Sequence, residues 1–76
     1  MKFSKEKQEP FSSSYTRTAL AKGWKIELCY NEYSNDFHFL AKKDNKAYNS
    51  CWDKKVFQDE SSCIAAIEQW IKEQPK

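Results

Sequence analysis

The chain has 76 residues, with 13 Lys and Arg against 11 Asp and Glu, and its formal net charge is +2. A chain of this length forms one small domain, which leaves little room for a pocket of the size that enzymes use. The weak, mixed charge produces no field that by itself indicates nucleic-acid binding. Aromatic residues make up 16% of the chain, which argues against disorder and predicts a small core built from large rings.

The spacing of the cysteines and the composition of the N-terminal residues indicate the cellular compartment of the protein. Cys29, Cys51 and Cys63 are odd in number and widely spaced, which fits neither a disulfide framework nor a Cys-x-x-Cys motif. Reduced thiols are therefore predicted. Residues 1–8 contain lysines and a glutamate but no apolar centre of a signal peptide, and no apolar run is long enough to span a bilayer. We expect a cytoplasmic protein with no membrane partner and no cofactor.

The first part of the chain contains one segment whose structure the sequence leaves open. Residues 1–14 include few apolar side chains, a proline and three consecutive serines, and are predicted to form a flexible N-terminal arm. Residues 15–76 then form a single α+β domain. Residues 15–22 fit a strand that leads into a three-residue loop and places Arg17 opposite Glu27, or a helix that ends at Gly23. Both remain open, with the strand preferred.

Alternating side chains predict the next strands. Residues 24–31 alternate between apolar and polar types, which is typical of a strand with one buried face. A polar turn at residues 31–36 leads to a second alternating segment. Asp44 and Asn45 suit a tight hairpin turn before a third strand over roughly residues 47–53. The apolar face of this sheet is predicted to contain Trp24, Ile26, Leu28, Phe37, Phe39 and Trp52.

The segment after Phe57 changes to a helical period, in which apolar residues recur every three or four positions. Asp59 is the expected N-cap, with Ser61 or Ser62 as alternatives, and Pro75 marks the end. The apolar stripe consists of Cys63, Ile64, Ile67, Trp70 and Ile71. The predicted fold class is α+β, an antiparallel sheet of three or four strands with one C-terminal amphipathic helix packed on one face.

The predicted strand register places Cys29 opposite His38, and His38 opposite Cys51, on the face away from the helix. These are metal-ligating residue types, but two cross-strand steps separate the outer thiols by about 10 Å, too far for one tetrahedral zinc ion. A Cys beside a His also suits a thiol nucleophile, yet no feature predicts a lowered thiol pKa or an oxyanion pocket. We expect neither a metal site nor an enzyme.

The face away from the helix and the loop beside it are the predicted contact surface for a protein partner. Tyr33 is the best anchor, because it is an aromatic ring on a polar turn, although the ring could instead fold back over the core. Tyr15 and Cys29 are expected on the same face. The predicted partner-binding residues are Glu32, Tyr33, Asp36, His38 and Leu40.

Nucleic-acid binding is the alternative, because lysines gather around two turns at one end of the predicted sheet. This alternative site consists of Lys22, Lys42, Lys43 and Lys46. If residues 15–22 were helical, the order helix, three strands, helix would resemble the double-stranded RNA-binding domain. That family binds phosphate with lysines at the start of its last helix, whereas residues 59–62 here are Asp, Glu, Ser and Ser.

In size and style the chain also resembles the small inhibitors that phages and mobile elements encode against bacterial defence, the anti-CRISPR proteins among them. The resemblance is carried by Trp24-x-Ile26-x-Leu28, Phe37-x-Phe39-Leu40 and Ala65-Ala66-Ile67-x-x-Trp70-Ile71. These segments form a core, so no functional residue is carried over. The resemblance implies an inhibitor that binds a protein effector complex. An exposed edge strand could also pair two copies, so we expect a monomer or a weak homodimer.

Overall fold

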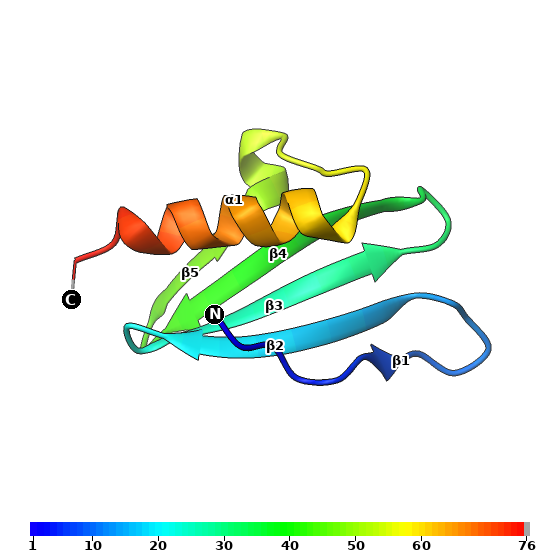
Figure 1. The fold of residues 1–76 in the computed structure, drawn as a ribbon, viewed down its shortest axis with the longest axis horizontal. Helices are drawn as coiled ribbons and strands as arrows, with labels where there is room; N and C mark the ends of the chain where they lie inside the picture. The colour runs from blue at the N-terminus through cyan, green and yellow to red at the C-terminus, as the bar shows by residue number, and fades with distance from the viewer. Residues whose placement is uncertain (76) are drawn as a thin grey trace.

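An antiparallel sheet with one helix on one face makes up the computed structural model, which describes residues 1–75 (Figure 1). The five strands lie side by side in chain order. They are β1 (Lys7–Gln8), β2 (Tyr15–Ala21), β3 (Trp24–Asn31), β4 (Asp36–Lys43) and β5 (Lys46–Asn49), followed by the 3-10 helix η1 (Ser50–Asp53) and the α-helix α1 (Glu60–Lys72). The predicted α+β class is confirmed, with five strands in place of three or four.

Tyr15–Ala21 form a strand, β2, so the strand alternative for this segment is confirmed and the helix alternative is wrong. Its register with β3 differs from the prediction by one residue. The connecting turn contains only Lys22 and Gly23, with φ values of 52° and 82°, a pair of left-handed residues that matches the twist of a two-residue hairpin. Arg17 therefore lies opposite Leu28 rather than Glu27. Tyr15 and Arg17 consequently lie on the helix-covered face, and not on the face where Tyr15 was expected.

The hairpin of β3 and β4 has the predicted register. Leu28 lies opposite Phe39, and Cys29 lies opposite His38. On the helix-covered face each residue therefore faces an apolar or aromatic residue across the two strands, while the opposite face carries the polar positions together with Leu40. The predicted alternation is therefore confirmed in residues 24–31 and in the second strand segment, which follows the turn at residues 31–36.

β5 is shorter than predicted, because two side chains bind backbone groups where the strand was expected to continue. The Asn49 side chain accepts a hydrogen bond from the Cys51 backbone N–H at 2.8 Å, which starts η1. The buried Ser50 hydroxyl accepts a hydrogen bond from the Phe39 N–H at 3.0 Å. Cys51 therefore does not extend the row of Cys29 and His38. Trp52 is 67% exposed, and its assignment to the core is wrong.

The chain returns to the sheet edge before α1. Phe57 pairs with Phe37 in a short antiparallel bridge with two backbone hydrogen bonds of 2.8 Å. Phe57 thus takes the position opposite Phe37 in which the predicted pairing of His38 with Cys51 would have placed Trp52. Asp59 then caps α1 as predicted, because its carboxylate accepts a hydrogen bond from the Ser62 N–H at 2.7 Å.

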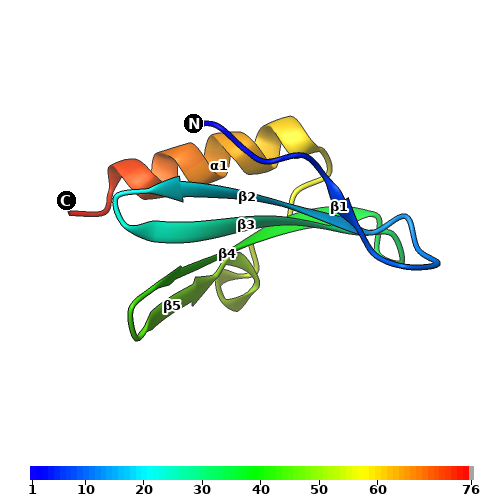
Figure 2. The same cartoon turned by 90° about the horizontal axis from the view of Figure 1, so that it is seen from below.

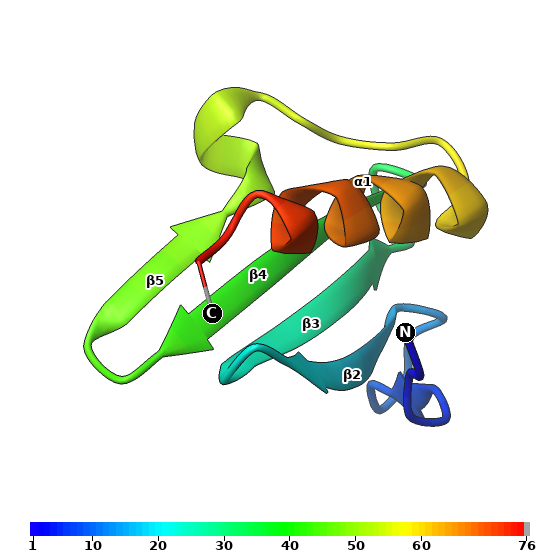
Figure 3. The same cartoon turned by 60° about the vertical axis from the view of Figure 1, so that its left-hand side comes forward.

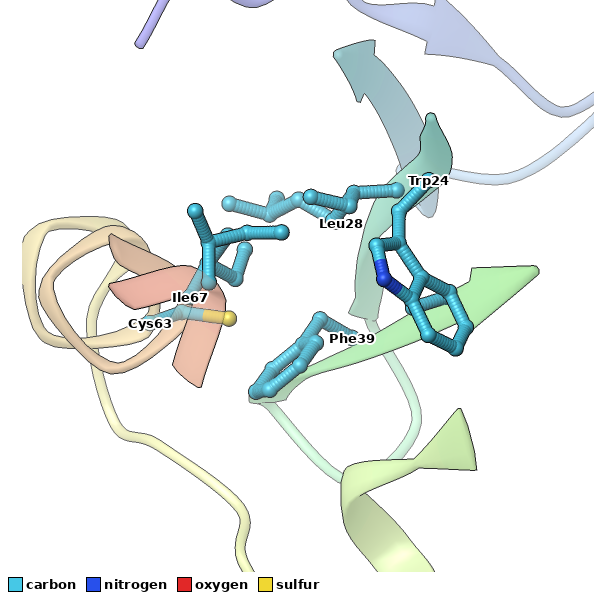
Figure 4. Packing of buried hydrophobic residues seen from close by; sticks show 8 residues of the cluster. Trp24, Leu28, Phe39, Cys63 and Ile67 are labelled. Atoms are coloured by element: carbon cyan, nitrogen blue, oxygen red, sulfur yellow. The ribbon is translucent and has the colours of Figure 1, made fainter. Parts of the chain in front are cut away.

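The core lies between α1 and the covered face of β3 and β4 (Figures 3 and 4). Cys63 and Ile67 of α1 point toward Leu28 and Phe39 of the sheet (Figure 4). Trp70 packs edge-on against Trp24, with ring centroids 5.0 Å apart. The predicted helix stripe and most of the predicted sheet face are therefore confirmed. Within residues 1–75, no helix has the length and apolar character needed to cross a membrane.

The N-terminal segment runs along the outer edge of β2 (Figure 2). Ser4 exchanges hydrogen bonds with Thr18, from its own N–H to the Thr18 carbonyl at 2.8 Å and from the Thr18 N–H to its hydroxyl at 2.9 Å. Phe3 packs against the core, and the Arg17 guanidinium lies 5.7 Å from the centre of its ring. The sequence prediction did not include these contacts, and the flexibility of residues 1–14 stays a prediction.

Candidate functional site

The sheet face opposite α1, here called the open face, consists of the alternate residues of β2, β3 and β4 whose side chains point away from the core. Figure 2 shows that α1 lies on the other side of the sheet. Cross-strand pairing arranges the open face in rows that run across β2, β3 and β4. These rows are Thr16, Cys29 and His38; Thr18, Glu27 and Leu40; and Leu20, Lys25 and Lys42. Leu20 is 79% exposed, whereas Leu40 is half-buried among its neighbours.

A hollow of about 370 Å³ lies on the open face at the end nearest the loop between β3 and β4. The segment after β1, the strands β2, β3 and β4, and the β3–β4 loop all contribute to it. Its lining includes Glu9, Thr16, Glu27, Cys29, Tyr33 and His38. The hollow therefore joins two of the predicted partner-binding residues, Tyr33 and His38, with acidic residues that the sequence did not single out.

The thiol and the imidazole of this hollow are both uncharged at neutral pH. Burial, with a smaller contribution from the nearby Glu27 carboxylate, raises the pKa of Cys29 to about 12. Burial lowers the pKa of His38, which the Asp36 carboxylate opposes. Both shifts oppose a thiolate beside an imidazolium, which is the arrangement of a reactive cysteine. Within residues 1–75, no three His, Cys, Asp or Glu side chains lie close enough together to hold a metal ion.

Tyr33 extends into solvent, with 85% of its surface exposed, so it does not fold back over the core. Asn31 orders the loop beneath it by accepting a hydrogen bond from the Tyr33 N–H at 2.9 Å. Asp36 accepts a hydrogen bond from the Ser34 hydroxyl at 2.8 Å at the other side of the loop. The structure thus brings Tyr33, Asp36 and His38 to one end of the open face, as predicted, with Leu40 in the next row.

Glu32 connects the loop to the N-terminal segment. Its carboxylate accepts a hydrogen bond from the Ser13 N–H. Its own N–H donates to the hydroxyl of Ser14, a buried residue, at 2.9 Å. Glu32 therefore has a structural contact, and it is a poorer candidate for a partner contact than Tyr33.

The lysines of the alternative site do not form one cluster, which corrects the prediction. The Lys22 ammonium donates hydrogen bonds to the carbonyls of Ile71 at 2.9 Å and Gln74 at 2.8 Å at the end of α1. Lys43 lies over the Trp24 ring, 6.0 Å from its centre, and Lys46 pairs with Lys43. Of the four, only Lys42 lies on the open face, because consecutive residues of a strand point to opposite sides. The element order needed for the RNA-binding resemblance is also absent from residues 1–75, since β2 is a strand.

Two acidic residues of the hollow were missed for different reasons. Glu27 lies in the polar half of the alternating segment of β3, so the period of two could have placed it beside His38. Glu9 lies just beyond β1, a two-residue strand without apolar side chains, which leaves no period to detect.

Comparison of the chain with protein-family models, with curated protein sequences and with solved structures finds no match. The residues of the open face are therefore the basis for inferring a function. The resemblance to anti-defence inhibitors stays a prediction.

Proposed function

We propose that this protein is a small binding module without enzymatic activity, and that it binds a protein partner through the open face and the β3–β4 loop. The observation that carries the proposal is the exposed Tyr33 ring beside a sheet face that α1 leaves uncovered. Exposed Leu20 and half-buried Leu40 supply apolar area on the same face. Such a combination of an aromatic anchor, apolar area and a polar surround is typical of protein interfaces.

The rigidity of this surface supports binding. The open-face residues of β3 are fixed on both sides by pairing with β2 and β4, and the loop that carries Tyr33 is held by Asn31 and by the N-terminal segment. A surface that is ordered before binding loses less conformational entropy when the complex forms. A chain of this size can therefore bind tightly with few contacts, which is what a stoichiometric inhibitor requires.

We further propose that the partner is a protein effector complex of bacterial defence. This follows from the resemblance to phage-encoded inhibitors, and the protein-binding proposal does not depend on it. The split of the four lysines makes nucleic acid the weaker candidate, because phosphate binding requires several cations on one surface.

A capture experiment tests the binding proposal. The tagged chain is used to recover proteins from a lysate that contains bacterial defence complexes, and the affinity of the recovered partner is measured by surface plasmon resonance. Tyr33→Ala is expected to weaken binding about 30-fold, which corresponds to the roughly 2 kcal/mol of a hot-spot residue. Trp52→Ala is the matched control, because Trp52 is also an exposed aromatic residue but lies on η1.

The control should change the affinity by less than about twofold, since most residues outside a hot spot contribute little. A partner that loses affinity with Trp52→Ala but not with Tyr33→Ala would place the contact surface elsewhere. Failure to recover any stoichiometric partner would count against the proposal as a whole.

A further inference from the structure

We propose that the hollow on the open face binds an arginine side chain of the protein partner. This inference deepens the proposed function and rests on it, because it assumes that the partner contacts the open face. The lining of the hollow contains the carboxylates of Glu9 and Glu27 but no lysine or arginine. Its two charged side chains at neutral pH therefore have the same sign.

Neither carboxylate forms an ion pair within residues 1–75. The ion pairs within residues 1–75 join the N-terminus to Glu68 and Arg17 to Glu60. Glu9 and Glu27 both act on the same point, since both carboxylates raise the pKa of the Cys29 thiol in addition to the larger effect of burial. The neutral His38 ring adds no positive charge that would oppose a cation.

The remaining groups of the hollow suit a guanidinium better than an ammonium. The Tyr33 ring lies at its rim and is free to stack on a planar cation. A guanidinium can donate to carboxylates on two sides at once, whereas an ammonium acts as a compact, strongly hydrated charge. The volume of about 370 Å³ lies within the lower range of pockets that hold a small ligand.

The charge of the open face changes sign along the strands, which gives the partner an orientation. Lys25 and Lys42 lie directly opposite each other in the row next to that of Glu27, and the three residues line a smaller hollow with Leu40. Glu27 is therefore an anion beside these lysines and balances part of their charge. A partner that places an arginine over the hollow and an acidic residue over these lysines would match both ends.

The test uses acetylated and amidated tetra-arginine as the probe, with tetra-aspartate as the probe of opposite charge, and follows both by amide chemical shifts of the intact chain. Tetra-arginine is expected to shift the amides of Tyr33, Cys29 and His38. Glu27→Gln should weaken its binding about two- to fivefold, the range of an exposed ion pair. Glu73→Gln is the matched control, because it removes the same charge from an exposed residue beyond α1.

The control should change the affinity by less than about 1.5-fold at physiological salt, because distant charges are screened. Equal effects of the two variants, shifts spread evenly over the surface, or shifts of the same three amides by tetra-aspartate would overturn the proposal. Glu9→Gln is a second variant for the same comparison, and circular dichroism checks that each variant folds.

Two further results separate this inference from the proposed function. If the captured partner is weakened by Tyr33→Ala but not by Glu27→Gln, the binding function holds and the arginine site is wrong. If tetra-arginine binds the hollow but no partner is captured, the site holds and the binding function is wrong. Self-association that Glu27→Gln abolishes, measured by sedimentation equilibrium, would show that a second copy supplies the cation and would overturn the assignment to a different protein.

Discussion

The Phe39→Ala variant is expected to lose roughly 3–5 kcal/mol of folding free energy, the usual cost of removing a buried phenylalanine ring. Phe39 is 2% exposed, and its ring centre lies 5.7 Å from that of Tyr48 and 6.1 Å from that of Trp70. A domain of 76 residues has a total stability of roughly 4–11 kcal/mol. The variant should therefore unfold at a much lower urea concentration, and at the lower end of this range it is largely unfolded at 25 °C.

The neighbouring Leu40→Ala variant is the control, because Leu40 lies on the open face and borders no part of the core. It should cost about 1 kcal/mol or less, as do most substitutions outside the core. Urea denaturation followed by tryptophan fluorescence compares the two variants. If Leu40→Ala cost as much as Phe39→Ala, both faces of β4 would be buried and the open face would not exist.

The second large effect is expected for Ser50→Ala. Ser50 is 0% exposed, and its hydroxyl accepts the hydrogen bond of the Phe39 N–H at 3.0 Å. The substitution leaves a buried N–H without a partner, which costs about 1–3 kcal/mol. It should also loosen η1, because this hydrogen bond fixes the start of η1 to β4. Thermal unfolding by circular dichroism measures the loss as a lower Tm.

Ser61→Ala is the matched control for Ser50→Ala, since Ser61 is exposed in the first turn of α1 and the Asp59 cap does not depend on its side chain. It should change the stability by less than about 0.5 kcal/mol. Equal Tm values for Ser50→Ala and the unchanged protein would mean that another group accepts the Phe39 N–H. The proposed reason for the end of β5 would then be wrong.

The sequence predicted the elements whose period extends over seven or more residues. β3, β4 and α1 each repeat an apolar position often enough to identify both the type of element and the buried side. β5 was assigned too many residues, because the end of that strand depends on two short polar side chains, Asn49 and Ser50. Side chains that compete for backbone hydrogen bonds in this way do not change the period of the apolar residues, so the pattern cannot predict them.

The register of β2 with β3 shows a second limit of prediction from the sequence. The strand was preferred over the helix, but its register depended on whether the turn has two or three residues. A change of one residue in a hairpin turn changes which residues face each other across the two strands. This single difference brings Arg17 to Glu60 of α1, with 3.0 Å between the charged groups, rather than to Glu27. Glu27 consequently has no ion pair within residues 1–75.

The candidate site could be predicted where it depends on alternation within one hairpin. His38 and Leu40 follow from the period of β4, and Tyr33 from its place in a polar turn. The separation of the four lysines could not be predicted in this way, because neighbouring strand residues point to opposite faces and Lys22 turns to the end of α1. Glu9 reaches the hollow only through the pairing of β1 with β2, a contact without apolar side chains.

The three leucines of the chain offer the most direct test of the two faces, since Leu28 is buried under α1 whereas Leu20 and Leu40 lie on the open face. The measurement is the relaxation of leucine methyl signals by a soluble gadolinium chelate, which acts on methyl groups according to their distance from solvent. We expect strong relaxation for Leu20, clear relaxation for Leu40 and protection for Leu28. Relaxation of Leu28 equal to that of Leu40 would contradict a sheet that is covered on one face and free on the other.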